Sequence, residues 1–336
     1  MGWWPLIKLL PQKTNFRYVR YARILGALSL LACVASLLLT LLPFKAPCAG
    51  LNCGVDFRGG TVLELSTAPR PVDLGALRSV MGAQGLGDVQ VQNFSTPADP
   101  TGVQNATVRF ETPQGRNPAE AVTRLKEALV ERLGPTRFTR TEVVGPKVSG
   151  ELFQAGLAAL VIAIGLMLLY IWFRFGLTFG IGAVAALFHD VILTFGLFAV
   201  TDLEFTLTGV AAILTIIGYS MNDTVVVLDR VRENLRKFKR MPLGELIDLS
   251  VNETLSRTII TGITGIMALT GLAVFGGEAL FPFAVAMIFG IVVGTYSSIY
   301  VAAPVLLLLG VKRGEDVEVV REGGKPGPRS SVVPSP

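Results

Sequence analysis

Residues 218–234 read GYSMNDTVVVLDRVREN, and they join a long apolar run, 210–217, to a strongly basic segment. A continuous helix through this stretch would carry Asn222 and Asp223 at membrane depth before it emerges near Asp229. A carboxylate at the centre of a membrane helix costs about 2.5–3.5 kcal/mol on insertion scales. Such a residue normally has a partner or a function, so Asp223 is the first candidate functional residue.

The composition of the chain is that of a membrane protein. Of its 336 residues, 51% are hydrophobic and only 16% are charged, a balance unlike that of soluble globular domains. The net charge of +5 is spread unevenly. The basic residues that precede the first apolar run, with no acidic residue among them, are Lys8, Lys13, Arg17, Arg20 and Arg23. This distribution indicates the positive-inside rule rather than nucleic-acid binding.

Residues 1–20 are therefore expected in the cytoplasm, followed by a first membrane span at about 21–43. The span is long enough to cross a hydrocarbon layer of about 30 Å. The chain starts with Trp3, Trp4 and basic residues, not with a short apolar region and a small-residue cleavage site. We interpret the first span as a retained anchor.

The segment 44–150 is polar, rich in proline and glycine, and free of any membrane-length apolar run. A segment of this size is a domain. Its periodicity predicts strands at 61–65, 89–94, 106–111 and 138–144, and helices at 71–84 and 118–134. The order β-α-β-β-α-β is that of a ferredoxin-like domain.

Five further spans are predicted when the apolar region 152–200 is divided at a short break, 174–176; left undivided, it gives four. The spans lie at about 152–173, 177–200, 205–228, 258–277 and 282–309. Breaks that carry Lys or Arg alternate with breaks that carry only acidic residues. By the positive-inside rule, this pattern gives six spans with both termini in the cytoplasm.

The sequence thus predicts a polytopic α-helical membrane protein. The domain 44–150 would lie outside the membrane on the periplasmic side. Residues 151–310 would hold the second to sixth transmembrane helices, with a cytoplasmic loop at 229–257. The tail, 311–336, is rich in Gly, Pro and Ser, so we expect it to be disordered in the cytoplasm.

Two interpretations of Asp223 are open. Its carboxyl group could be neutral or hydrogen-bonded to Asn222, Tyr219 or a neighbouring helix and hold the bundle together. It could instead carry protons, and an ionisable group inside a membrane is a functional hypothesis by default. Arg257 begins the fifth span: it could extend to the membrane surface, or it could reach inward and control the protonation of Asp223.

His189 and Asp190 lie in the middle of the third span, and His189 is the only histidine in the chain. The pair is typical of a proton relay, because imidazole titrates near neutral pH. Adjacent residues point in different directions on a helix, however, so the two side chains need not touch. Packing between helices is the favoured interpretation of His189. Asp190 has the better functional claim, because a mid-span carboxylate is costly.

No metal or nucleotide site is expected. The chain has one histidine, no HxxxH or CxxC pattern, and nothing that matches GxxxxGK[ST]. Cys48 and Cys53 follow the first span on its outer side. A disulfide is plausible in an oxidising periplasm, and two free thiols remain the alternative.

Four segments resemble the signature sequences of the SecD/SecF family of protein-export membrane proteins, and within it the SecF type. They are VDFRGGT (55–61), VGPKVSGEL (144–152), GYSMNDTVVVLDRVREN (218–234) and LSRTIITG (255–262). Four segments at family-like spacing are a strong signal. The signature residues are Asp56, Gly59, Gly60, Gly218, Ser220, Asp229, Arg230 and Arg232.

The resemblance implies a six-helix bundle of the resistance-nodulation-division (RND) type in the bacterial inner membrane. It implies a heterodimer with SecD, and contacts with SecYEG, YajC and unfolded preprotein. It also implies no enzymatic activity and no cofactor: the pair would use the proton-motive force, with protons as the coupling ion, to drive late translocation and release of preproteins. In such sequences the Asp of the NDT segment and the Arg of the SRT segment are linked to proton passage. Here these are Asp223 and Arg257, with Asn222 beside them.

Two other functions fit the same residues less well. A proton-driven RND exporter of small molecules or lipids would use the same bundle and acid. Such pumps, however, usually need larger outer domains and a second half in the same chain. A passive scaffold that only stabilises the translocon would tolerate the loss of the Asp223 carboxylate.

Overall fold

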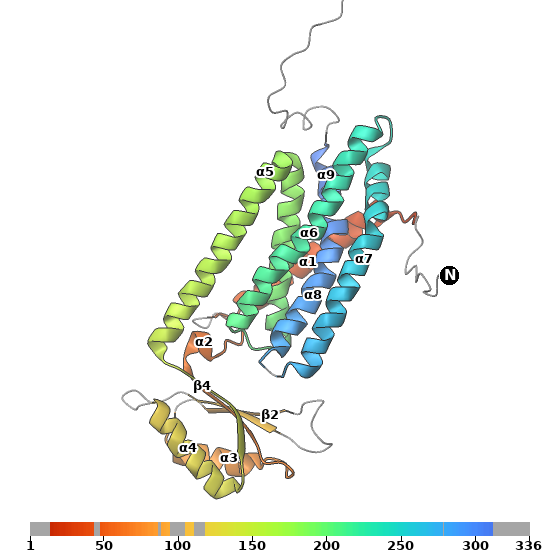
Figure 1. Cartoon of the computed structure of the whole chain (residues 1–336). Helices are drawn as coiled ribbons and strands as arrows, with labels where there is room; N and C mark the ends of the chain where they lie inside the picture. The colour runs from red at the N-terminus through yellow and green to blue at the C-terminus, as the bar shows by residue number, and fades with distance from the viewer. Residues whose placement is uncertain are drawn as a thin grey trace, which may run out of the picture.

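The computed structural model describes residues 14–43, 48–86, 89–94, 105–110, 118–277 and 279–311. A bundle of long helices stands on a small α/β domain (Figure 1). Among the described residues, 5 helices are long and apolar enough to cross a membrane. They are α1 (Tyr18–Leu41), α5 (Pro146–Thr201), α6 (Leu207–Lys237), α7 (Leu243–Phe275) and the run Phe281–Leu309, which comprises α8 (Phe281–Ser297), the π-helix η1 (Ser298–Ala302) and α9 (Ala303–Leu309). The predicted tail and most of the predicted N-terminal segment lie outside the described residues.

Helix α5 contains a sharp turn. Its 56 residues are interrupted at Gly176, where the backbone has φ 72° and ψ −173°, a conformation that glycine adopts readily. The turn falls within the predicted break at 174–176. Its two limbs run back alongside each other (Figure 1), and a Cβ on Gly180 would contact Ile171 across the turn.

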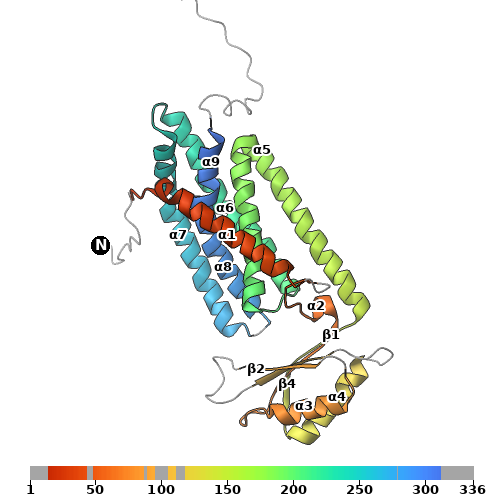
Figure 2. The same ribbon diagram turned by 180° about the vertical axis from the view of Figure 1, so that it is seen from behind.

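Helix α1 crosses the outside of the bundle obliquely (Figure 2). Its side chains are mostly exposed and apolar, as expected for a helix that faces lipid. The start of this helix is bound to α7: Asn252 accepts from Phe16 N–H, just before α1, at 3.0 Å, and Asp248 accepts from Val19 N–H, in its first turn, at 2.9 Å. These hydrogen bonds join the start of α1 to residues more than two hundred positions away in the sequence.

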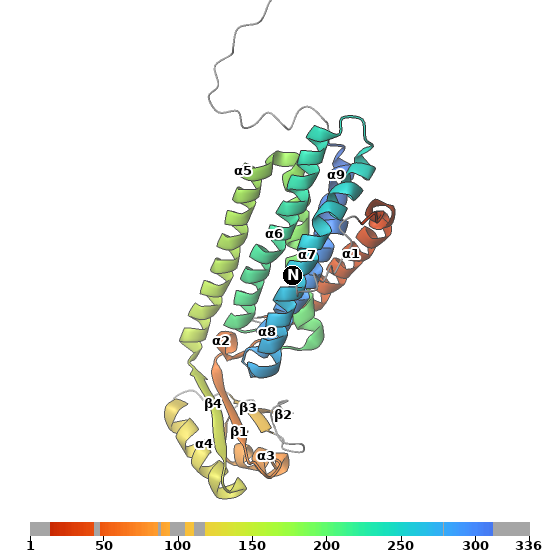
Figure 3. The same cartoon turned by 45° about the vertical axis from the view of Figure 1, so that its right-hand side comes forward.

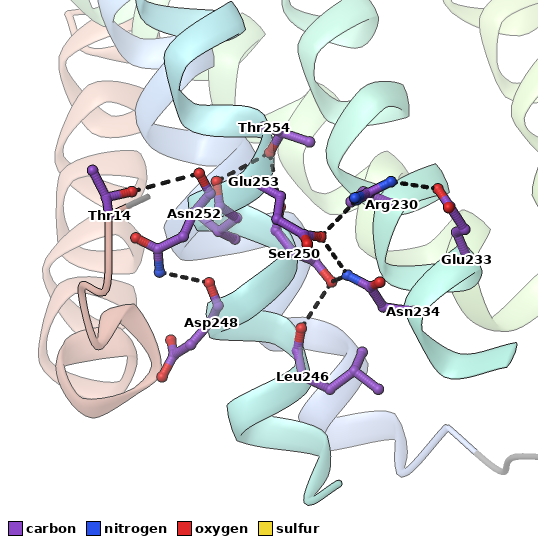
Figure 4. A network of polar contacts seen from close by, with 11 residues as sticks. Thr14, Arg230, Glu233, Asn234, Leu246, Asp248, Ser250, Asn252, Glu253 and Thr254 are labelled. Carbon is purple, nitrogen blue, oxygen red and sulfur yellow. Dashed lines mark hydrogen bonds and ion pairs between the residues drawn. The ribbon is translucent and has the colours of Figure 1, made fainter. Parts of the chain in front are cut away.

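The predicted loop 229–257 is almost entirely helical. Helix α6 continues to Lys237 and α7 begins at Leu243. Polar contacts hold the two helices together at this end (Figure 4): Arg230 donates to Glu253 at 2.6 Å, and Asn234 donates to Glu253 at 2.8 Å. These polar contacts, together with buried apolar side chains such as Leu235 and Leu246, stabilise the ends of both helices where they extend past the apolar spans.

The small domain is built from β1 (Gly60–Ser66), α3 (Leu74–Ala83), β2 (Val89–Phe94), β3 (Asn105–Phe110), α4 (Pro118–Leu133) and β4 (Arg137–Val144). Its sheet is antiparallel with the strand order β2-β3-β1-β4. The two helices cover the face that points away from the bundle (Figure 3). Leu63 and Leu65 of β1 bury their side chains under these helices, beside Leu77 and Leu125.

The opposite face of the sheet is polar and points toward the bundle. Because side chains alternate along a strand, Glu64 of β1 lies on this face, and it accepts a hydrogen bond from Arg140 of β4 at 3.2 Å. Arg140 also donates to Glu142 at 2.8 Å. Burial lowers the pKa of Arg140, but the hydrogen bonds that it donates to the two carboxylates and their negative charges outweigh burial and raise the pKa.

The domain meets the bundle through a short joint. Helix α2 (Val55–Arg58) precedes β1, and the residues before it pair with the loop between α5 and α6. Gly54 N–H donates to the Phe205 carbonyl at 3.0 Å, and Phe205 N–H donates to the Asn52 carbonyl at 2.7 Å. A disulfide joins Cys48 and Cys53 directly ahead of this joint, so the structure favours the bridged alternative.

Small residues set the distance between the helices of the bundle. A Cβ on Gly294 of α8 would lie 2.8 Å from the Cβ of Ser220 on α6. A Cβ on Gly182 of α5 would lie 2.7 Å from the carbonyl oxygen of Ala302. Close approach of backbones through such residues is typical of membrane bundles.

Gly294→Ala should therefore destabilise the protein, because the added methyl group forces α6 and α8 apart. We expect a loss of about 1–3 kcal/mol, the usual cost of overpacking. Thermal unfolding in detergent measures it. Gly271→Ala on α7 is the matched control, since no atom lies within 4 Å of its added Cβ. Equal unfolding temperatures for the two variants would contradict the close packing.

Candidate functional site

Three ionisable side chains are buried within the helices of the bundle. Asp190 of α5 is 1% exposed, His189 of α5 is 5% exposed and Asp223 of α6 is 3% exposed. A charged group in such surroundings is costly unless hydrogen bonds or an opposite charge satisfy it. The two carboxylates are satisfied very differently.

Asp190 lies at the centre of a hydrogen-bond network. Its Oδ1 atom lies 2.8 Å from His189 Nδ1. Its Oδ2 atom accepts hydrogen bonds from Ser220 of α6 and, at 2.9 Å, from Ser297 of α8. The carboxylate thereby joins three elements of the bundle.

His189 and Asp190 do touch, although adjacent positions on a helix need not. Both side chains bend toward each other, and the imidazole ring stacks on Tyr296 with the ring centres 6.0 Å apart. The Tyr296 hydroxyl donates to the Leu25 carbonyl at 2.9 Å and lies 2.8 Å from Ser29 Oγ. The network that starts at Asp190 therefore extends to α1.

The other nitrogen of His189 has no such contact. Nε2 is buried and has no hydrogen-bond partner within the described part of the chain. His189 thus packs against Tyr296 of α8 while one of its ring nitrogens has no hydrogen-bond partner among the described residues.

Asp223 contrasts with Asp190. Its Oδ2 atom is buried and has no hydrogen-bond partner among the residues that the structure describes. The Tyr219 hydroxyl donates instead to the Thr261 carbonyl at 2.9 Å, and Asn222 is exposed on the helix surface. The described contacts therefore include no hydrogen bond from Asn222 or Tyr219 to this oxygen, and both interpretations of Asp223 stay predictions.

Arg257 of α7 is the charged group that acts electrostatically on Asp223. The arginine is exposed on the surface of the bundle and forms no direct ion pair with Asp223 among the described contacts. Asp223 and Arg257 thus lie on neighbouring helices, but no described contact joins their side chains.

The remaining signature residues hold elements in place. Asp56 Oδ2 accepts from Leu207 N–H at 2.9 Å and so binds the first residue of α6. Gly59 and Gly60 have φ of 77° and 114°, which favours glycine where the chain turns from α2 into β1. Gly218 has no atom within 4 Å of an added Cβ, so its side of α6 is open.

The basic end of α6 carries the other three signature residues. Asp229 forms an ion pair with Arg174 at the turn of α5. Arg230 is paired with Glu233 at 2.7 Å as well as with Glu253. Arg232 donates to the Arg174 carbonyl at 3.5 Å. These contacts fix α6 against the turn of α5 and against α7.

Sequence reasoning missed Ser297 and Tyr296 as partners of the buried pair. The available signal was the polar segment TYSS at 295–298, which interrupts an otherwise apolar span. Reasoning from the sequence also missed the ion pair between Arg109 and Glu204, which are 95 residues apart. Within the described residues, no group of three His, Cys, Asp or Glu side chains could hold a metal ion.

Residues 125–312 match the family model "Protein export membrane protein SecD/SecF, C-terminal", and residues 49–69 match "SecD/SecF GG Motif". A protein translocase subunit SecF of Cereibacter sphaeroides is 44% identical over 313 residues, which are 92% of this chain and 94% of the relative. The chain belongs to the SecD/SecF family. A protein translocase subunit SecF of Rickettsia bellii is 39% identical over 312 residues, 92% of this chain and 98% of the relative.

A solved structure has the same fold. The crystal structure of SecDF from Thermus thermophilus, described as a translocon-associated membrane protein, is 32% identical and superimposes with a TM-score of 0.77. The match covers 91% of this chain and 40% of the SecDF chain. The region of the GG motif includes Gly59, Gly60 and the joint between domain and bundle.

Ser297→Ala should destabilise the bundle, because it removes one of the three donors to the buried Asp190 carboxylate. We expect a loss of about 1–3 kcal/mol in the free energy of unfolding. Ser298→Ala is the matched control: Ser298 is equally buried, but its hydroxyl donates only to the Thr295 carbonyl one turn away. The measurement is thermal unfolding of both variants in detergent. Equal losses of stability would show that the hydrogen bond from Ser297 to Asp190 does not stabilise the bundle.

Proposed function

We propose that this chain is a SecF-type subunit of the bacterial Sec protein-export machinery. Together with SecD it would use the proton-motive force to drive late translocation and release of preproteins across the inner membrane, without enzymatic activity of its own. The observation that carries the proposal is Asp223: a buried carboxylate whose Oδ2 atom has no hydrogen-bond partner among the described residues, in a bundle of this family.

The two buried acids suit different tasks. Asp190 takes part in a hydrogen-bond network that joins three elements of the bundle. Asp223 has one oxygen without a hydrogen-bond partner among the described residues and forms no direct ion pair with Arg257 among the described contacts, so it would bind and release a proton without breaking such a network. We assign proton transfer to Asp223 and the positioning of α5, α6 and α8 to Asp190 with His189.

The energy available is sufficient for a conformational step. One proton that crosses a potential of 100 mV releases about 2.3 kcal/mol. In the proposed cycle, Asp223 takes up a proton from the periplasmic side, which weakens its attraction to Arg257. The helices then shift, the outer domain is reoriented, and release of the proton to the cytoplasm resets the protein.

The proposed architecture has six membrane spans, which are α1, the two limbs of α5, α6, α7 and the run of α8, η1 and α9. The domain with the strand order β2-β3-β1-β4 and two helices on one face is proposed to be ferredoxin-like and periplasmic. The charges support this orientation. Asp202 and Glu204 lie at the end of the bundle next to the domain, and Arg236 and Lys237 at the opposite end.

We further propose that SecD binds the exposed polar face of α6 and α7. Asn222 and Gly218 on α6, and Arg257 and Thr264 on α7, are exposed within the bundle's length. Groups such as an amide and a guanidinium do not face lipid at membrane depth without a partner. We extend the proposal from the family to SecYEG, YajC and unfolded preprotein as further partners.

Two alternatives remain weaker. A proton-driven exporter of small molecules or lipids would share the bundle, but the relatives and the solved structure named above are protein-export proteins. A passive scaffold for the translocon would not need a carboxylate at Asp223 rather than its neutral analogue.

Asp223→Asn should abolish proton-dependent preprotein translocation, and Asp223→Glu should keep part of it, because glutamate still titrates. The measurement is proton flux and translocation in vesicles that contain this protein with SecD and SecYEG. Asp202→Asn is the control: Asp202 is exposed, and asparagine tolerates its backbone φ of 55°. Translocation by Asp223→Asn at the wild-type rate would support the scaffold.

Gly218→Leu should weaken the association with SecD, because a bulky side chain would stand between the two proteins on the open face of α6. The measurement is the yield of SecD that copurifies with the tagged chain. Gly165→Leu on the first limb of α5 is the matched control, since neither glycine has an atom within 4 Å of an added Cβ. Equal yields from the two variants would place the SecD surface elsewhere.

A further inference from the structure

The loop 202–206 connects the two helices that carry the buried acids. Asp190 lies on α5 before the loop, and Asp223 lies on α6 after it. Any relative movement of α5 and α6 must therefore displace or strain this loop. The outer domain contacts the loop directly, so it is the shortest structural route from the acids to the domain.

Most of the joint holds the loop to the segment that leads into the domain, not to the sheet itself. The backbone hydrogen bonds of Phe205 reach residues 52 and 54. The Asn52 side chain donates to the Asp202 carbonyl at 3.0 Å, and Asp56 accepts from Leu207 N–H. These contacts do not involve the sheet, which the chain connects to the bundle at β1, after α2, and at β4, where only Gly145 precedes α5.

One ion pair joins the sheet to the loop. Arg109 of β3 donates to Glu204 through Nη2 and Oε2 at 2.5 Å, and their side chains are 19% and 16% exposed. Within the described residues, no other ion pair links a strand to the bundle. Arg109 Nε is buried there without a hydrogen-bond partner, so the tie depends on a single charged contact.

A polar cavity lies beside this pair. Its volume is about 320 Å³, and its lining includes Asp56, Arg140, Glu142, Glu204 and Thr206. Side chains of β4 that line the cavity are therefore not packed against the bundle, although the end of β4 is connected to α5 through Gly145. The Arg109–Glu204 pair joins β3 to the loop next to this cavity.

The surroundings of the Glu204 carboxylate raise its pKa. Burial is the main cause, and although Arg109 and Arg140 lower the pKa, Glu142 and Asp56 add to the rise. These four groups on β3, β4 and α2 are the charges that act on Glu204. As the pH falls, Glu204 therefore loses the charge of the ion pair at a higher pH than an ordinary glutamate would.

We propose that the Arg109–Glu204 ion pair couples movement of α5 and α6 to the outer domain, holding the sheet against the loop in one state and releasing it in another. The inference rests on the proposed proton-driven function and adds Glu204 and Arg109 as positioning residues for it. Neither residue contacts Asp223, the proposed proton carrier. Both would act by holding the outer domain in one position relative to the bundle.

The test uses Glu204→Gln, Arg109→Gln and the exchanged pair Arg109→Glu with Glu204→Arg, in the full chain with SecD and SecYEG in vesicles. Each single change should reduce proton-dependent translocation severalfold and speed hydrogen exchange of residues 202–206. The exchanged pair should restore part of both. Arg137→Gln, an exposed change on β4, is the control and should behave as the wild type.

A cysteine pair tests release directly. Arg109→Cys with Glu204→Cys should form a disulfide on oxidation, block translocation, and recover after mild reduction. The inference is overturned if the single variants and the oxidised pair translocate like the wild type while the wild type depends on the proton gradient. A wild type without any proton dependence would instead refute the proposed function, and hydrogen exchange would still show whether the pair restrains the loop.

Discussion

The high cost of an unsatisfied charge among apolar helices shapes this structure. Asp190 avoids the cost by accepting from His189, Ser220 and Ser297, and in doing so it fixes α5, α6 and α8 relative to one another. The small residues between α6 and α8 depend on the same arrangement, because Gly294 meets Ser220, the residue that donates to Asp190. One buried carboxylate thus determines both the polar contacts and the close packing of the bundle.

Asp223 shows the opposite solution. It lies three residues after Ser220 on the same helix, yet one of its oxygens has no hydrogen bond within the described structure. Asp190, on α5, is held by a hydrogen-bond network, whereas one oxygen of Asp223, on α6, has no partner among the described residues. This contrast between two acids on neighbouring helices is the physical basis for proposing different roles for them.

Much of the fold follows from local patterns in the sequence. Alternation of apolar residues predicted β2 at 89–94, where it is found, and the Arg–Phe–Gly break predicted the turn at Gly176. Apolar residues that recur every fourth position from Leu243 to Leu255 indicate a helix, and this stretch forms the start of α7. The extension of α6 to Lys237 was not predicted, because the ion pair that holds it joins residues on different helices. The same holds for the site: a mid-span acid is visible in the sequence, but its partner Ser297 is 107 residues from Asp190. Such contacts depend on how the helices assemble.

Helix α6 is continuous for 31 residues, which corresponds to a rod about 45 Å long at ~1.5 Å per residue. Its first residue is bound by Asp56 at the joint, and its last turns are clamped by Arg230 and Glu253. Asp223 lies near the middle of this rod. A change of charge at Asp223 would therefore act on the middle of a stiff helix whose two ends are bound to different parts of the protein, one to the joint with the outer domain and one to α7.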